Sequence, residues 1–440
     1  MITRKLLRTA AIIATVGALS ISATACSGTA APTATEKTRG ETIDVTVPMP
    51  VLPKSMLAEF TKSTGIKVKW NTVDFDSLMT KIAASGAAHT YYGDVTYFNF
   101  NNIQQYSKLG WFLPLGKYLP ASATKDTVGK AAFTYNKQML GMPYDASVGI
   151  TTLNKTMFAK AGITTMPTTI DEYTADLKAI KTAGIVKYPL NIPFSASEGL
   201  TAYWIQATVA FGGPSIFDKS GKEQFSSPDS PGYKAAEWMV GAMKDGLVAP
   251  GAINDGDYQG QQTLQAQGLA ASTLYDYSGN ISAIYNDPKQ SKVANQIVYI
   301  PMPGVTGVSS NIDVADAIGI PSTAKAPAAA AKFVQWLTDP KTQIKLAGDG
   351  AADEAWGPQG VPSNLTAINT LNAAGKIPGG DVIVDILKNH SQPYFIYGAP
   401  EWYPQFSHAV QTSLHAAAAG TMSVADAIKA MAAAADQNSN

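Results

Sequence analysis

The sequence predicts an α/β protein in which strands alternate with helices. Between residues 43 and 98, short runs with a period of two are separated by stretches whose apolar residues recur at helical spacing. The chain has 440 residues, 45% of them hydrophobic, which is enough for two globular domains with buried cores. Such alternation predicts βαβ units and a mainly parallel sheet, which ligands approach at the carboxyl ends of the strands.

The first strands and helices follow from local patterns. Residues 43–47 alternate as a strand does and stop at Pro48, and residues 66–70 repeat that pattern. Met56, Leu57 and Phe60 lie at helical spacing and predict a helix over 55–63. A second helix is expected after residue 76, ending near Gly86, and a third strand over 94–98.

The middle and end of the chain give further elements. Residues 141–155 form a β-run that is entered through Pro143 and is rich in small and β-branched side chains, and a helix is expected from 156 to Gly162. Residues 331–337 predict another helix. The last one is expected over 423–435, where Val424, Ala427, Ile428 and Met431 are helically spaced.

Residues 1–26 have the three parts of a secretory signal. Basic residues come first, and the apolar run that follows, Ala10 to Ile21, is too short for a permanent membrane span. The residues ending at Cys26, the only cysteine in the chain, resemble a bacterial lipobox, so we expect Cys26 to be lipidated. The alternative is a cleaved leader that merely contains a cysteine. Residues 27–42 are predicted to be a flexible tether.

Composition and motifs argue against several classes of function. Removal of the leader leaves 30 basic against 33 acidic residues, and this balance gives no support for nucleic-acid binding. The four histidines are scattered, and no metal-binding, nucleophile-elbow or phosphate-loop motif is present. We therefore expect no cofactor, no metal and no catalytic residue.

Motifs along the chain resemble, in order, those of extracellular solute-binding proteins, the receptor subunits of ABC importers. The closest resemblance is to the maltose or carbohydrate-type branch, and the motifs cover nearly all of residues 43–440. They are F-x-x-x-x-G-I-K-V at 60–68, W-F-L-P-L at 111–115, the β-run 141–155, D-G-L-V-A-P-G at 245–251, Q-G-L-A-A at 267–271, I-G-I-P-S at 318–322 and A-K-F-V-Q-W-L-T-D-P at 331–340.

The resemblance implies a two-lobed periplasmic-binding-protein-like fold of type II. Each lobe would be a mainly parallel sheet flanked by helices, with the ligand between the lobes. The chain would cross between them three times, near Asp145–Ile150, Asp313–Ala317 and Gly360–Ser363. Lobe one would comprise residues 43–146 plus 314–361, and lobe two residues 147–313 plus 362–440.

Aromatic and polar residues near strand ends and crossings are the candidate ligand contacts. Sugars need carboxylates and amides for their hydroxyls and aromatic faces for their C–H surfaces. Phe98 falls where the maltose-binding branch stacks an aromatic ring on the sugar, with core packing as the alternative. The other candidates in lobe one and at the crossings are Asp76, which could instead cap a helix, Asn99, Asn101, Tyr144, Asp145 and Asp313.

Lobe two and the later loops add further candidates. Glu198 and Trp204 resemble second-lobe contacts, although Trp204 could be buried and Glu198 could serve a helix start. Asp276 and Tyr277 follow an apolar run, and we expect them at the cleft. Trp356 and Trp402 lie in loops, where large aromatic side chains are usually buried or used in binding.

Together these observations predict a lipid-anchored binding protein on the outer face of the cytoplasmic membrane. It would capture a sugar or oligosaccharide, act as a monomer and deliver its ligand to an ABC permease. One alternative is a receptor for another polar solute, such as a polyamine held by carboxylates and aromatic rings. A second alternative, from another class, is an exported lipoprotein hydrolase.

Overall fold

The computed structural model describes residues 38–254, 257–348 and 361–439. The expected signal peptide, Cys26 and Trp356 lie outside the described residues. Within the described ranges, no helix combines the length and the apolar character needed to span a membrane.

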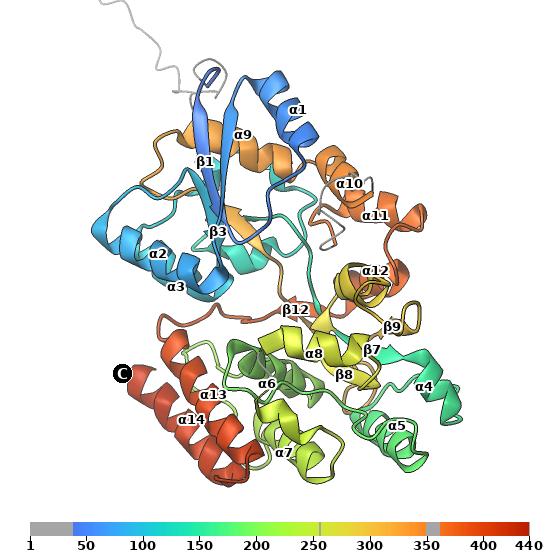
Figure 1. The fold of residues 1–440 in the computed structure, drawn as a ribbon. Helices are drawn as coiled ribbons and strands as arrows, with labels where there is room; N and C mark the ends of the chain where they lie inside the picture. Colours follow the sequence, from blue (N-terminus) through green and yellow to red (C-terminus); the bar gives the residue numbers. More distant parts are fainter. Residues whose placement is uncertain (1–37, 255–256, 349–360, 440) are drawn as a thin grey trace, which may run out of the picture. The chain divides into compact units, whose positions relative to one another are not determined.

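The first sheet has five strands and is built mainly from the first third of the chain. Its strands and their nearby helices are β1 Thr42–Val47, α1 Lys54–Thr64, β2 Lys67–Thr72, α2 Phe75–Ala88, β3 Val95–Phe98, α3 Ile103–Leu109, β6 Gly141–Pro143 and β11 Ala317–Gly319 (Figure 1). The spatial order is β2-β1-β3-β11-β6. β1 pairs in parallel with β2 and β3, as expected, whereas β11 pairs antiparallel with β3 and β6.

Alternation in β1 builds the core of this sheet. Ile43, Val45 and Val47 are fully buried in one cluster with the ring of Phe60 from α1. That ring meets Phe333 of α9 (Pro327–Leu337) edge to face, with centroids 5.4 Å apart. The strand and the helix predicted for residues 43–63 are therefore confirmed, and so is the helix predicted over 331–337.

The second sheet has three described strands, β7 Gly149–Asn154, β8 Ser272–Tyr277 and β9 Ile297–Ile300, in the order β8-β7-β9. Both pairings are antiparallel, which differs from the mainly parallel sheet that the resemblance implied. The strands that flank β7 come from much later in the chain and run opposite to it. A parallel bridge at the edge joins Leu190 to Ser272.

Helices enclose the second sheet and carry most of the core. They are α4 Lys155–Lys160, α5 Ile170–Thr182, α6 Glu198–Ala210, α7 Pro231–Lys244, α8 Asp257–Ala266, α13 Tyr403–Ala418 and α14 Val424–Ser439 (Figure 1). α6 is buried along its whole length after Glu198, beneath α7 and α13. α14 confirms the helix predicted at the end of the chain.

The remaining elements connect these two assemblies. They are the hairpin β4 Thr134–Tyr135 and β5 Gln138–Met139, the parallel pair β10 Asn311–Asp313 and β12 Ser391–Pro393, and the helices α10 Pro340–Gly348, α11 Leu365–Ala373 and α12 Gly380–Asn389. The β-run predicted over 141–155 is divided: β6 belongs to the first sheet and β7 to the second.

Candidate functional site

Two segments link the sheets, and a third runs beside them. Residues 144–148 connect β6 to β7, residues 314–316 connect β10 to β11, and residues 361–363 lie alongside. The backbone bonds that hold the three together are Tyr144 N to Asp316 O at 3.0 Å, Val314 N to Ser147 O at 3.0 Å and Ala146 N to Val361 O at 2.7 Å. Because these bonds tie the segments to one another, the side chains they carry are brought together.

Three carboxylates gather on or directly beside the first two segments. Asp145 is 8% exposed, and its Oδ1 accepts a hydrogen bond from the backbone N–H of Asp316 at 2.7 Å. The Tyr97 hydroxyl, from β3, donates to Asp316 Oδ1 at 2.5 Å. Asp313 ends β10, and its buried Oδ1 has no hydrogen-bond partner among the described residues. A buried acceptor without a partner is a group that a ligand hydroxyl could satisfy.

Burial makes these groups poor anions and good hydrogen-bonding partners. It raises the pKa of Asp145 well above its usual range, and the neighbouring Asp316 carboxylate raises it further. Burial also raises the pKa of Asp316 and brings that of Asp313 to about 7. The pKa values of the Tyr97 and Tyr144 phenols lie well above 10, again mainly through burial, so both remain donors at neutral pH.

Phe98 does not face this cluster. Its side chain is fully buried, with the rings of Tyr106, Phe112 and Phe133 edge-on at 5.2, 4.8 and 6.0 Å. The backbone of Gly141 packs so closely on the Phe98 ring that a Cβ at this position would lie 2.8 Å from it. A ligand therefore cannot reach the ring from the side of Gly141. β3 is an inner strand whose four residues are all buried, which leaves Phe98 no ligand-facing side. The expected stacking role is therefore corrected to core packing.

The asparagines after β3 are only partly buried. Asn99 Oδ1 accepts from the backbone N–H of Asn101 at 2.9 Å and starts the short helix η1 (Phe100–Asn102). Asn101 Oδ1 is buried and lacks a hydrogen-bond partner among the described residues. Asp76 is the second residue of α2, a helix capped by Asp74, whose carboxylate accepts from Ser77 N at 2.9 Å.

Glu198 presents an exposed carboxylate at the start of α6 that is anchored by α13. The hydroxyls of Tyr403 and Ser407 both donate to it, the latter at 2.5 Å, and Gln411 Nε2 donates at 3.2 Å. Burial, followed by the charge of Glu198, raises the pKa of Tyr403 well above its usual range. The carboxylate is thus held in one orientation while its position remains accessible to solvent.

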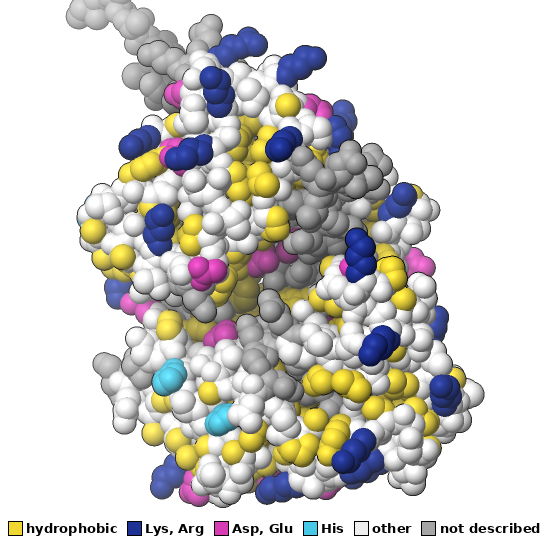
Figure 2. Space-filling model, viewed as in Figure 1, with side chains coloured by type: hydrophobic (Ala, Val, Ile, Leu, Met, Phe, Trp, Pro, Cys, Tyr) yellow, Lys and Arg dark blue, Asp and Glu magenta, His cyan; other side chains and the backbone are white. Residues whose placement is uncertain are grey.

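A chain of rings joins this carboxylate to the side of the molecule that carries the first sheet. Tyr394 lies after β12, with its hydroxyl 3.4 Å from that of Tyr403. Its ring centroid is 5.4 Å from that of Phe100 on η1. Figure 2 shows the visible face hollowed across its middle, with acidic and hydrophobic side chains on the walls of the hollow.

Two candidates on the second-sheet side are internal. Trp204 is fully buried, and its indole N–H donates to Gly232 O at 2.9 Å. Asp276 is 5% exposed and accepts from the hydroxyls of Thr152 at 3.1 Å and Tyr285 at 2.6 Å. Trp204 fills the core, and Asp276 is the acceptor of a buried polar network; both expected cleft roles are therefore corrected.

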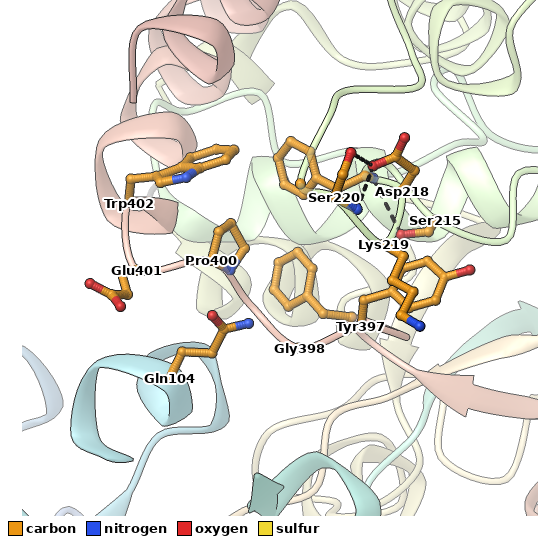
Figure 3. Close-up of a pocket in the computed structure, with 13 residues that line it drawn as sticks. Gln104, Ser215, Asp218, Lys219, Ser220, Tyr397, Gly398, Pro400, Glu401 and Trp402 are labelled. Atoms are coloured by element: carbon orange, nitrogen blue, oxygen red, sulfur yellow. Dashed lines mark hydrogen bonds between the residues drawn. The ribbon is translucent and has the colours of Figure 1, made fainter. Parts of the chain in front are cut away.

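Tyr277 and Trp402 are partly exposed. Tyr277 is the last residue of β8 and pairs with Gly149, the residue that follows the first crossing segment. The centroid of its ring lies 5.5 Å from that of Tyr275. Trp402 precedes α13 and lines a cavity of about 410 Å³ (Figure 3). Among the described residues, no group of three or more His, Cys, Asp or Glu side chains could hold a metal ion.

Sequence reasoning missed four residues that complete the arrangement: Tyr97, Asp316, Tyr394 and Tyr403. Tyr97 directly precedes Phe98, and the resemblance to the maltose-binding branch pointed to Phe98 alone. Asp316 lies within the predicted second crossing, where a second acid three residues after Asp313 was the available signal. The two later tyrosines are about 200 residues from Glu198, and no local pattern links them to it.

Comparison with known proteins places this arrangement in a family. Residues 44–344 match the family described as bacterial extracellular solute-binding protein. A curated Brucella abortus (strain 2308) protein, whose name describes it as a binding protein, is 26% identical over 199 residues. That match covers 44% of this chain and 46% of the relative, so the chain spans about half the length of the curated relatives it matches.

Solved structures share the fold over most of the chain. A ribitol complex from Agrobacterium radiobacter K84 has a TM-score of 0.77 at 20% identity, covering 91% of this chain and 99% of that one. A D-mannitol complex from Agrobacterium vitis S4 has a TM-score of 0.75 at 22% identity and 90% and 98% coverage. A maltose-bound T. maritima protein has a TM-score of 0.73 at 18% identity and 90% and 99% coverage. The fold is thus that of the two-lobed binding proteins, and the chain belongs to the bacterial extracellular solute-binding proteins.

Proposed function

We propose that this protein is a lipid-anchored receptor that captures a carbohydrate between two lobes and delivers it to an ABC importer. The observation that carries the proposal is the set of buried carboxylates and phenols on and beside the crossing segments, where the Asp313 Oδ1 acceptor has no hydrogen-bond partner among the described residues. Neutral donors and acceptors of this kind suit hydroxyl groups. The solved relatives named above carry ribitol, D-mannitol and maltose.

In this proposal the crossing segments are the hinge. Lobe one comprises residues 43–146 plus 314–361, and lobe two residues 147–313 plus 362–440. Rotation about the crossings would close Glu198 and the residues near it over a ligand held by the carboxylates. The proposed ligand contacts are Asn99, Asn101, Tyr144, Asp145, Asp313, Asp316, Glu198, Tyr277 and Trp402. No bond in the ligand is made or broken.

Ligand binding should raise the melting temperature of the chain without residues 1–26. A ligand at 100 times its dissociation constant adds about 2.7 kcal/mol to the free energy of unfolding. The panel would contain ribitol, D-mannitol, glucose, maltose, maltotetraose, N-acetylglucosamine and chitotetraose, with spermidine as the cationic competitor. Each mixture is also analysed for cleavage products.

The outcomes separate the three candidate functions. Stabilisation by a sugar or polyol that is recovered intact supports the proposal. Stabilisation by spermidine alone would indicate a polyamine receptor, in which the three clustered carboxylates bind the cation. Cleaved oligosaccharide would identify a hydrolase.

The proposed lipid anchor has its own test. Cys26→Ser should move the protein from the membrane fraction to the medium, because a thiol is needed for lipidation and the chain has one cysteine. Quantitative blotting of both fractions measures the change, with Ser27→Ala as the neighbouring control. Retention of Cys26→Ser in the membrane would contradict lipidation at this residue.

A further inference from the structure

A cavity of about 410 Å³ is lined by Trp402 and by none of the other proposed ligand contacts. Its walls come from three places: Gln104 of α3, the turn around residues 215–221, and the segment 395–402 that leads into α13 (Figure 3). The volume falls within the roughly 300–1,000 Å³ of small-molecule sites.

Aromatic rings form much of the wall. Trp402 packs edge-on against Phe217, with centroids 5.0 Å apart and planes at 79°. Phe395 and Tyr397 line the cavity from the other end of the same segment. The Tyr397 side chain is 51% exposed, so its ring is accessible to a ligand.

Polar groups stand beside these rings. Gln104 points from α3 toward the segment that carries Gly398 and Pro400 (Figure 3). Gly398 has φ +81°, and a Cβ there would lie 3.0 Å from Gln104 Nε2, so glycine permits this approach. Lys108 and Glu401 form an ion pair at 3.0 Å next to it. Rings with adjacent amide and charged groups are what a sugar ring requires.

The cavity is adjacent to the Glu198 site, because rings of its wall pack against the helix that anchors Glu198. The ring of Phe395, a wall residue, lies 4.9 Å from that of Tyr403, whose hydroxyl donates to Glu198. On the other side, Phe217 packs at 5.0 Å on Phe406, the residue before Ser407, which also donates to Glu198. The N-terminal part of α13 therefore contacts both the cavity wall and the anchored carboxylate.

We propose that this cavity is a distal subsite for a later sugar unit of an oligosaccharide whose first unit binds near Glu198. This inference rests on the proposed carbohydrate-binding function and makes it more specific, because a polyol or monosaccharide could not occupy both places at once. Trp402 and Tyr397 would cover the C–H face of the distal sugar, and Gln104 would bond its hydroxyls.

Isothermal titration calorimetry of the purified protein with two series of oligosaccharides of increasing length tests the distal subsite. One series runs from glucose to maltotetraose, and the other from N-acetylglucosamine to chitotetraose. Within the series that binds, affinity should rise with the length of the oligosaccharide. Trp402→Ala and Tyr397→Ala should each weaken binding of the longer ligands about ten- to a hundredfold, as loss of an aromatic anchor does, and Tyr397→Ala should leave the affinity for the monomer unchanged. Trp402→Phe should retain most of the gain, and Leu269→Ala, at a side chain 57% exposed outside the cavity, is the control.

The results distinguish this inference from the proposed function. If the wild-type protein binds a monosaccharide or polyol and no oligosaccharide more tightly, the distal subsite is refuted while sugar capture stands. If affinity rises with oligosaccharide length, but the Tyr397→Ala and Trp402→Ala variants show the same gain in affinity as the wild type, the additional sugar units bind outside this cavity. If no sugar or polyol binds at all, the proposed function fails, and the subsite fails with it.

Discussion

Replacing Phe98 by alanine should lower the free energy of unfolding by about 3–5 kcal/mol, the usual cost of truncating a buried Phe. The ring is fully buried among Tyr106, Phe112 and Phe133, and neighbours held by a sheet and two helices cannot collapse into the space. Urea denaturation measures the loss. The affinity of the folded fraction for its ligand should not change.

Tyr277→Ala is the matched comparison for Phe98→Ala. Tyr277 is only partly buried at the end of β8, so its truncation should cost less stability and, on the proposed function, more affinity. If instead Phe98→Ala weakened binding and left unfolding unaltered, the ring would have to reach the ligand in a rearranged protein, contrary to the packing described here.

Replacing Asp313 by asparagine should stabilise the ligand-free protein above pH 7 and weaken sugar binding. Burial raises the pKa of Asp313 to about 7, so the folded state holds a proton that the unfolded state releases near pH 4. Wild-type stability must then fall as pH rises between these values. Asparagine does not titrate, so the variant should gain about 1–4 kcal/mol at high pH, and this gain should vanish near pH 4.

Urea denaturation at pH 4 and pH 8 would reveal this difference. Asp287→Asn is the control of opposite sign, because hydrogen bonds from Gln290 and Lys289 lower the pKa of that exposed carboxylate. It should therefore be slightly less stable than the wild type at pH 8. Equal stability of Asp313→Asn and wild type at both pH values would show that the Asp313 charge is solvated in the folded protein.

The same variant tests the role of Asp313 in binding. Its Oδ1 has no hydrogen-bond partner among the described residues. Above pH 7, where Asp313 is ionised, a hydrogen bond from a ligand hydroxyl to this charged acceptor is worth about 1.5–3 kcal/mol. At pH 8, Asp313→Asn should therefore lower the affinity for the ligand that the thermal-shift panel identifies by roughly ten- to a hundredfold. Such a residue would reduce the stability of the empty protein and contribute to its affinity for ligand.

Periodicity predicted the strands and helices of residues 43–98, because each element there shows its pattern within a few residues. The same reasoning treated 141–155 as one run. A strand that ends in one sheet and a strand that begins in the next have the same β-branched composition, and only the pairing partners distinguish them. The antiparallel second sheet was not predictable either, since its flanking strands come from residues 272–300.

The candidate site shows where local patterns stop being informative. Alternation could not show whether Phe98 faces a ligand, because an inner strand covered on both faces buries the side chains on either side of it. Asp276 was expected at the cleft because it follows an apolar run, yet it is buried, and hydroxyls from β7 and from Tyr285 compensate for its burial. The orientation of Glu198 depends on α13, about two hundred residues later.

The position of β11 also has a consequence for the order of assembly during synthesis. This strand lies between β3 and β6 in the first sheet, although residues 144–316 separate it from β6 in the chain. During synthesis, β3 can pair with β1, but the strand that lies between β3 and β6 is missing until residue 319 has been made. Until then β6 cannot be added to the sheet. A nascent chain that lacks β11 therefore cannot complete this sheet, and the folding of this part of the protein must wait until most of the chain has been made.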